Sequence, residues 1–105
     1  MTASHRIVRN VVVQAWGTPA VTVGSVNEPR DMEELGVRFN EKWIYRLGSR
    51  QPEKPAERVI YWLRYDLVAC HLVFPSGKRV AEDLAAVLAG RRDRRFHPAD
   101  AARAD

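Results

Sequence analysis

The sequence predicts a single α+β domain, in which a curved, largely antiparallel sheet of four to five strands packs against one C-terminal amphipathic helix. Residues 37–47 and 58–74 alternate apolar and polar side chains, as strands do. Most connections are too short for parallel crossovers, which favours antiparallel pairing. Residues 78–89 carry one apolar helical stripe. The length of 105 residues fits one domain, predicted at residues 1–90 and followed by a basic, flexible tail at 91–105.

The N-terminal third predicts a β-hairpin followed by a short helix. Residues 6–16 contain four β-branched valines, which helices disfavour, and are predicted as a strand. Residues 20–26 form the second predicted strand, after the breaker Gly17-Thr18-Pro19. Residues 31–35 are predicted as a short helix or turn that ends at Gly36.

The remaining strands follow from the period-2 pattern. In residues 37–47, Glu41 and Ile44 are the two interruptions of the alternation, which puts five apolar side chains on one predicted face: Val37, Phe39, Trp43, Tyr45 and Leu47. Residues 48–57 are the main predicted loop. Residues 58–74 are too long for one ordinary strand, so we expect a turn or a bulge near residues 64–66. The predicted order is therefore β, β, short α, β, β, β, α.

The predicted C-terminal helix covers residues 78–89 and stops at Gly90. Its stripe consists of Val80, Leu84, Val87 and Leu88. One helix covers one face of a sheet. The other face would then be left to solvent, polar residues or a second subunit.

Charge and cysteine content limit the partners and the compartment. The net charge of +4 permits nucleic acid, acidic proteins or anionic membrane surfaces as partners. No apolar run approaches the ~20 residues of a membrane span, so no membrane association is predicted. Cys70 is the single cysteine and lies in an apolar run, which predicts a buried thiol in a reducing, cytoplasmic compartment.

Metal, cofactor and catalytic patterns are weak. His5, Cys70, His71 and His97 lack the spacing of metal ligands, so no metal and no cofactor is predicted. Asp66 and Glu41 are the two candidates for acid or base chemistry, provided that burial shifts their pKa values. A turn or an ion pair is the favoured role for Asp66, and a rim position or an ion pair is the favoured role for Glu41. A small pocket enzyme with Asp66 or Glu41 as acid or base is therefore only the second alternative function, and a chain that is not an enzyme is the favoured prediction.

Nucleic-acid binding is the first alternative function. A basic strand face with neighbouring aromatic rings, together with an arginine run after the helix, would contact phosphates. Alternation separates Trp43 and Tyr45 from the nearest basic side chains, which weakens this hypothesis. Its residues are Arg38, Lys42, Arg46, Arg58, Arg64, Arg91, Arg92, Arg94 and Arg95.

A non-catalytic interaction module is the leading hypothesis. Some apolar side chains fall on the faces opposite the main apolar sets, and would be exposed if one helix covers one face. The predicted interface consists of Ile44, Ile60, Trp62 and Arg64. Arg and Trp are enriched in interface hot spots. We expect a homodimer or a complex with another protein through this exposed sheet face.

Overall fold

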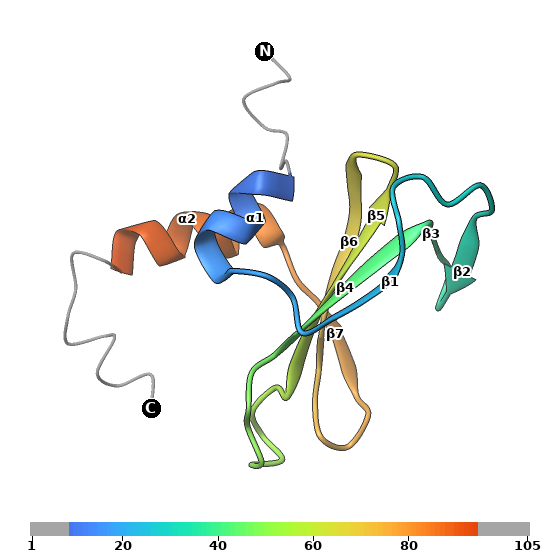
Figure 1. Ribbon diagram of the computed structural model, residues 1–105. Coiled ribbons are helices and arrows are strands. Elements are labelled where there is room, and N and C mark those ends of the chain that lie inside the picture. Colours follow the sequence, from blue (N-terminus) through green and yellow to red (C-terminus); the bar gives the residue numbers. More distant parts are fainter. Residues whose placement is uncertain (1–8, 95–105) are drawn as a thin grey trace.

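The computed structural model describes residues 9–94, and it confirms the predicted α+β class with a mainly antiparallel sheet (Figure 1). Helices form the two ends of this segment and strands lie between them. The elements are α1 (Arg9–Trp16), β1 (Val21–Gly24), β2 (Met32–Glu34), β3 (Val37–Phe39), β4 (Glu41–Arg46), β5 (Glu57–Leu63), β6 (Asp66–Val73), β7 (Arg79–Ala81) and α2 (Leu84–Arg94).

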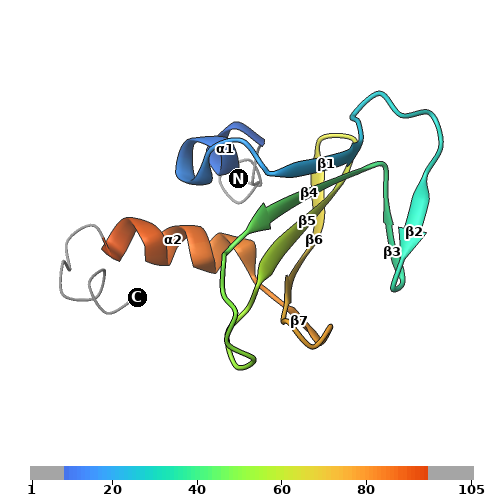
Figure 2. The same cartoon turned by 60° about the horizontal axis from the view of Figure 1, so that its bottom comes forward.

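Five strands form the main sheet, in the order β1-β4-β5-β6-β7, and all of its pairs are antiparallel. β2 and β3 form a separate two-stranded hairpin. Figure 2 shows α1 and α2 on one side of the sheet and the β2–β3 hairpin on the other. We call these two sides the helix-covered face and the hairpin face.

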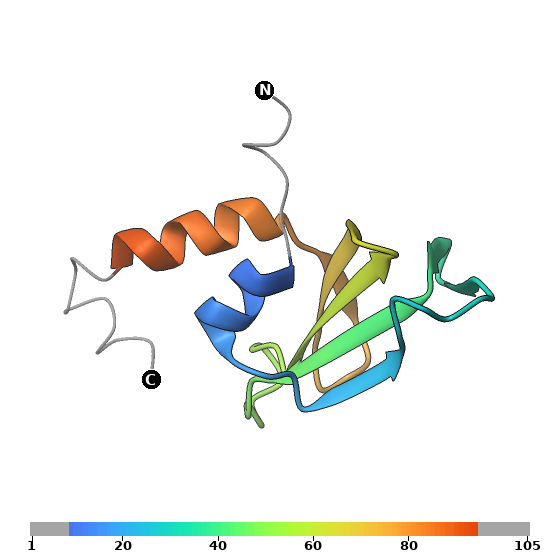
Figure 3. The same cartoon turned by 45° about the horizontal axis from the view of Figure 1, so that its top comes forward.

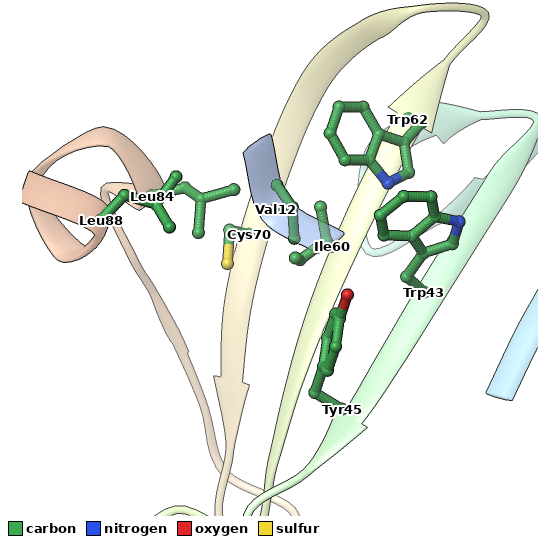
Figure 4. Close-up of a cluster of buried hydrophobic side chains, with 8 residues drawn as sticks. All are labelled: Val12, Trp43, Tyr45, Ile60, Trp62, Cys70, Leu84 and Leu88. Carbon is green, nitrogen blue, oxygen red and sulfur yellow. The ribbon is translucent and has the colours of Figure 1, made fainter. Parts of the chain in front are cut away.

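Each face has its own apolar cluster. On the helix-covered face, strand side chains pack with residues of both helices (Figure 4): Val12, Trp43, Tyr45, Ile60, Trp62, Cys70, Leu84 and Leu88. On the hairpin face, the buried residues are Phe39, Val59 and Tyr61. The sheet is therefore apolar on both sides, so alternation alone does not indicate which side the helices cover.

Residues 58–74 are divided as predicted. β5 and β6 are joined by a turn at Arg64 and Tyr65, and Arg64 has a left-handed φ of 59°. The ladder also shifts register between Tyr61 and Trp62, which marks a bulge. As a result, Leu67 packs against the helix-covered cluster, whereas Ala69 packs against the hairpin-face cluster.

The predicted strand at residues 6–16 is wrong over its described part, because residues 9–16 form α1. Val12 is fully buried, and Ala15 and Trp16, at positions i+3 and i+4, pack against the same cluster. Burial of this helical stripe outweighs the strand preference of consecutive valines. The strand predicted within residues 20–26 is confirmed as β1. The predicted hairpin is wrong, because β1 pairs with β4.

The predicted short helix at residues 31–35 is also wrong. β2 and β3 pair around Leu35 and Gly36, whose φ angles are 53° and 79°. Two consecutive residues with positive φ are typical of the tight two-residue turn of a β-hairpin. Gly36 therefore serves a hairpin turn and does not end a helix.

The predicted strand at residues 37–47 is interrupted at Asn40. The Asn40 side chain is fully buried, donates to the Val26 carbonyl at 3.2 Å and accepts from the Arg64 backbone N–H at 2.8 Å. Across this break the side chains change face, so that Phe39 lies in the hairpin-face cluster and Trp43 in the helix-covered cluster. Ile44 consequently points to the hairpin face.

The C-terminal helix begins later than predicted. Residues Arg79–Ala81 form β7, which pairs with β6. The helix α2 starts at Leu84 and continues through Gly90 to Arg94. Asp83 caps the helix, since its Oδ1 accepts from the Ala86 N–H at 3.3 Å. The predicted tail overlaps α2 at residues 91–94, and residues 95–105 lie outside the described part. Neither described helix is long and apolar enough to cross a membrane.

Candidate functional site

The four residues of the predicted interface do not form one exposed surface. Ile60 and Trp62 are fully buried under α1 and α2, so their predicted exposure is wrong. The reason is that α1 and α2 cover the face that was predicted to be exposed, and alternation alone does not indicate which face the helices cover. Ile44 lies on the opposite, hairpin face and is half-buried. Arg64 lies in the β5–β6 turn, where its guanidinium donates to the Glu28 carbonyl at 2.7 Å.

Arg9 links α1 to side chains on the helix-covered face of the sheet. Its guanidinium lies 4.9 Å from the ring centroid of Trp43 and 5.3 Å from that of Trp62, and it forms an ion pair with Glu41. The second oxygen of Glu41 accepts from Trp43 Nε1 at 2.9 Å. Glu41, a candidate acid or base, is therefore held by structural contacts. The role of Arg9 was not predicted from sequence, because residues 6–16 were predicted as a strand and no contact between Arg9 and Glu41 was expected.

Several candidate phosphate-binding residues already have carboxylate partners. Arg38 pairs with Asp31, Lys42 with Glu34, and Arg58 with Glu82. These contacts use the same donors that a phosphate would need. Arg46 is exposed on β4. Of the predicted arginine run, Arg91, Arg92 and Arg94 belong to α2, and Arg95 lies outside the described residues. Nucleic-acid binding stays a prediction.

Titratable side chains from several strands meet on the hairpin face around Tyr61. The Tyr61 hydroxyl donates to Glu34 Oε1 at 2.8 Å and accepts from Arg79 at 2.9 Å. Lys42 Nζ lies 3.1 and 3.3 Å from the two Glu34 oxygens. The His71 ring lies edge-on to that of Tyr61, with centroids 5.4 Å apart. Through Glu34, which lies on β2, these bonds link the β2–β3 hairpin to β4 and β5 of the main sheet.

The pKa values in this cluster are shifted. Burial, together with the Glu34 carboxylate, raises the pKa of Tyr61 to about 12. Burial of Glu34 acts to raise its pKa, but the Tyr61 and Lys42 hydrogen bonds and the nearby positive charges outweigh it and lower the pKa. Burial and the charge of Arg79 lower the pKa of His71. Tyr61 and His71 are therefore neutral and Glu34 is ionised near pH 7.

Among residues 9–94, these groups do not make an obvious catalytic pair. The Tyr61 hydroxyl is engaged on both sides, and its raised pKa makes it a poor proton donor. An open depression is lined by Glu28, Arg30, Asp31 and Met32, and includes neither Asp66 nor Glu41. Asp66 is exposed at the start of β6. No group of three or more potential metal ligands occurs in the described segment.

A further feature is the free edge of β1. β1 is the outermost strand of the sheet, with β4 as its partner (Figure 3). Ser25 N donates to the Asn40 carbonyl at 3.1 Å. Hydrogen-bonded pairs alternate along an antiparallel ladder, so residues 21 and 23 direct their backbone groups to β4. The backbone groups of Thr22 and Gly24 are consequently directed away from the sheet.

The edge of β1 carries no charge. Residues 10–27 contain no Asp, Glu, Lys, Arg or His, although such residues are frequent elsewhere in the chain. Natural edge strands are commonly protected by charge, proline or bulges. The opposite edge, β7, follows this pattern because it contains Arg79 and lies between Lys78 and Glu82. β1 has no charged residue of its own on either side.

Apolar side chains of β1 lie on the hairpin face, next to this edge. Val21 is opposite Ile44 in the ladder, and Val23 is opposite Lys42. Val23 is 37% exposed, and Val21 and Ile44 are half-buried. Of the predicted interface residues, Ile44 therefore adjoins this edge. Sequence reasoning missed the edge because strand order is not readable from alternation, although the long uncharged stretch was a visible signal.

The chain has no match among protein-family models, curated protein sequences or solved structures. Two features of the described residues have functional potential. In the Tyr61 cluster, Tyr61 bonds to Glu34 and Arg79, while His71 Nδ1 is buried without a hydrogen-bond partner. At the β1 edge, the backbone groups of Thr22 and Gly24 are directed away from the sheet.

Proposed function

We propose that this chain is a non-catalytic protein-interaction module that binds an extended protein strand along the free edge of β1. The observation that carries the proposal is an uncharged edge strand whose outward backbone groups, on Thr22 and Gly24, have no partner strand among the described residues. In strand addition, backbone hydrogen bonds supply affinity and side-chain contacts supply specificity. An unprotected edge is therefore a ready template for another strand.

The side chains next to the edge support this function. Val21, Val23 and Ile44 give the hairpin face an apolar strip beside the edge. A strand added at β1 would extend the sheet and place its alternate side chains beside Val23. Affinity would then come from main-chain bonds together with burial of this strip.

The other candidate functions have less support. The Tyr61 hydroxyl is engaged by Glu34 and Arg79, and the basic residues Arg38, Lys42 and Arg58 are paired with carboxylates. Cys70 is a buried free thiol, which is consistent with a reducing compartment and supports a cytoplasmic location.

A labelled peptide tests this function. The probe is a synthetic fluorescein-labelled peptide with the sequence of residues 19–27, titrated with the full chain while fluorescence anisotropy is followed. We expect saturable binding that weakens by about tenfold or more, or about 1.4 kcal/mol, in Val23→Glu and Thr22→Pro. Thr22→Pro removes an outward N–H, and an edge strand tolerates proline on its open side.

The matched control is Val80→Glu on the other edge strand. Val23 and Val80 are 37% and 39% exposed, so the two substitutions add the same charge to similarly exposed edge positions. Val80→Glu should bind the peptide like the unmodified chain. Equal binding by Val23→Glu and the unmodified chain, or no binding at about 1 mM chain, would exclude strand addition at β1.

A further inference from the structure

We infer that the strand bound at β1 is β1 of a second copy of this chain, which makes a homodimer whose two sheets join across a two-fold axis at Val23. This inference rests on the proposed function, because it names the partner at the same edge. It differs from the interface predicted from sequence, which relied on Ile60 and Trp62, and these are buried.

The outward groups of β1 match an antiparallel copy of themselves. Thr22 and Gly24 are two residues apart, so Thr22 of one chain can lie opposite Gly24 of the other, and the reverse. Each such pair exchanges both backbone bonds, which gives about four bonds between the chains. Val23 then faces Val23 of the second copy in a non-hydrogen-bonded pair, where Cβ atoms approach to about 4.5–5.5 Å.

The side chains also fit this pairing. Gly24 has no side chain, so it leaves room for Thr22 of the second copy on the same side of the joined sheet. The position of Gly24 is fixed, because its φ is 75° and an added Cβ would lie 2.2 Å from the Asn40 carbonyl oxygen. On the hairpin face, the apolar strip containing Val21 and Val23 would continue into the same strip of the second copy.

Charge favours a copy of this strand over a charged partner. Like charges directly opposite each other destabilise a strand pair, whereas residues 10–27 contain no charged side chain. β1 therefore pairs with itself without repulsion and offers no charge to select an acidic or basic peptide. At the β7 edge, Arg79 and its charged neighbours Lys78 and Glu82 would make self-pairing less favourable.

The pairing is short, so the dimer should be weak. Stable interfaces bury roughly 1,200–2,000 Å² in total and involve about 20–30 residues on each side, whereas β1 has only four residues. We therefore expect reversible association with a Kd of about 10 μM or weaker. Such a dimer forms at high chain concentration and dissociates on dilution.

Sedimentation velocity of the full chain tests the inference between about 5 μM and 1 mM. The unmodified chain should shift from monomer toward twice its mass, and Val80→Glu should do the same. Val23→Glu should stay monomeric, because the two introduced carboxylates would meet on the axis. Within its own chain, that carboxylate lies opposite Lys42, so the variant should fold. Circular dichroism verifies its fold.

Charge complementation identifies the second copy. Val23→Lys lies opposite Lys42 within its own chain, so circular dichroism must first verify that this variant folds. Folded Val23→Lys alone should also be monomeric, whereas an equimolar mixture of Val23→Glu and Val23→Lys should associate, since opposite charges then meet at the axis. A dimer that Val23→Glu leaves intact, or a mixture that remains monomeric, would overturn the inference.

The peptide experiment separates this inference from the proposed function. If the unmodified chain stays monomeric but binds the 19–27 peptide in a Val23-dependent way, the second copy is wrong and strand addition at β1 stands. If neither the chain nor the peptide associates at β1, both are wrong.

Discussion

Arg58 on β5 and Glu82, just after β7, form two hydrogen bonds of 2.7 and 2.9 Å. The ring of Trp16 stacks 4.4 Å from the Arg58 guanidinium carbon, and the Cys70 thiol lies 3.3 Å from Glu82 Oε1. Both charged side chains are mostly buried. This pair links the sheet to the end of α1 and the start of α2, so Arg58 stabilises the fold rather than offering a free cation.

Removal of the Glu82 carboxylate should destabilise the protein strongly. Glu82→Ala leaves the Arg58 charge buried without its partner, which typically costs about 3–5 kcal/mol. Urea denaturation measures the loss in the free energy of unfolding. The control is Asp31→Ala, which breaks the exposed pair with Arg38 and should cost about 1 kcal/mol or less. Equal losses in the two variants would refute the structural role of Glu82.

Gly24 should tolerate substitution much less than Gly48. Both residues have positive φ angles, but an added Cβ meets the Asn40 carbonyl at Gly24 and nothing within 4 Å at Gly48. Gly48→Ala should cost about 1–2 kcal/mol for the left-handed conformation alone. Gly24→Ala should cost about 1–3 kcal/mol more, because the edge strand must shift. Thermal or urea unfolding of both variants checks the difference, and a smaller loss in Gly24→Ala would contradict the described approach to Asn40.

The Tyr61 hydroxyl should contribute to the attachment of the β2–β3 hairpin. Tyr61→Phe removes one bond to Glu34 and one from Arg79, so we expect a loss of about 1–2 kcal/mol in the free energy of unfolding. Tyr65→Phe is the control, since Tyr65 is 65% exposed, and it should change stability by less than about 0.5 kcal/mol. Denaturant titrations in which Tyr61→Phe matches the unmodified chain would show that the hydroxyl contributes nothing.

His71 should make stability depend on pH in the weakly acidic range. Burial and the charge of Arg79 lower its pKa below 6.5 in the folded chain, so the unfolded chain binds this proton more readily. The stabilising contribution of neutral His71 is complete above about pH 6.5. It is lost as the pH falls through the pKa that His71 has in the folded chain. The urea concentration at the unfolding midpoint should therefore decrease as the pH is lowered from about 7.5 to 5. His71→Gln should make this decrease smaller. An identical pH profile for both chains would rule out this role.

The sequence predicted those elements whose alternation is long and whose turns are marked. Residues 58–74 divide near Arg64 as expected, because seventeen alternating residues exceed an ordinary strand. Residues 9–16 were predicted wrongly because consecutive valines favour strands. The competing signal, Val12 with Ala15 and Trp16 at helical spacing, becomes decisive only when the sheet is present to bury it.

The candidate site was less predictable than the fold. Alternation correctly separates Ile60 and Trp62 from Val59 and Tyr61, but both sets are buried. Which face the helices cover depends on packing between segments that are distant in the sequence. Strand order decides which strand lies at an edge, and alternation within one strand contains no information about it. The edge position of β1 is therefore known only from the folded chain, although the uncharged stretch that contains β1 is visible in the sequence.

Amide hydrogen exchange at Thr22 and Gly24, followed by NMR at low and high chain concentration, tests the role of β1 most directly. In dilute solution their outward amides should exchange rapidly, and at high concentration they should become protected. The outward amides of the other edge strand, at Arg79 and Ala81, should exchange equally at both concentrations. Protection that appears at Thr22 and Gly24 alone supports pairing of two β1 strands. Rapid exchange at both concentrations would contradict it.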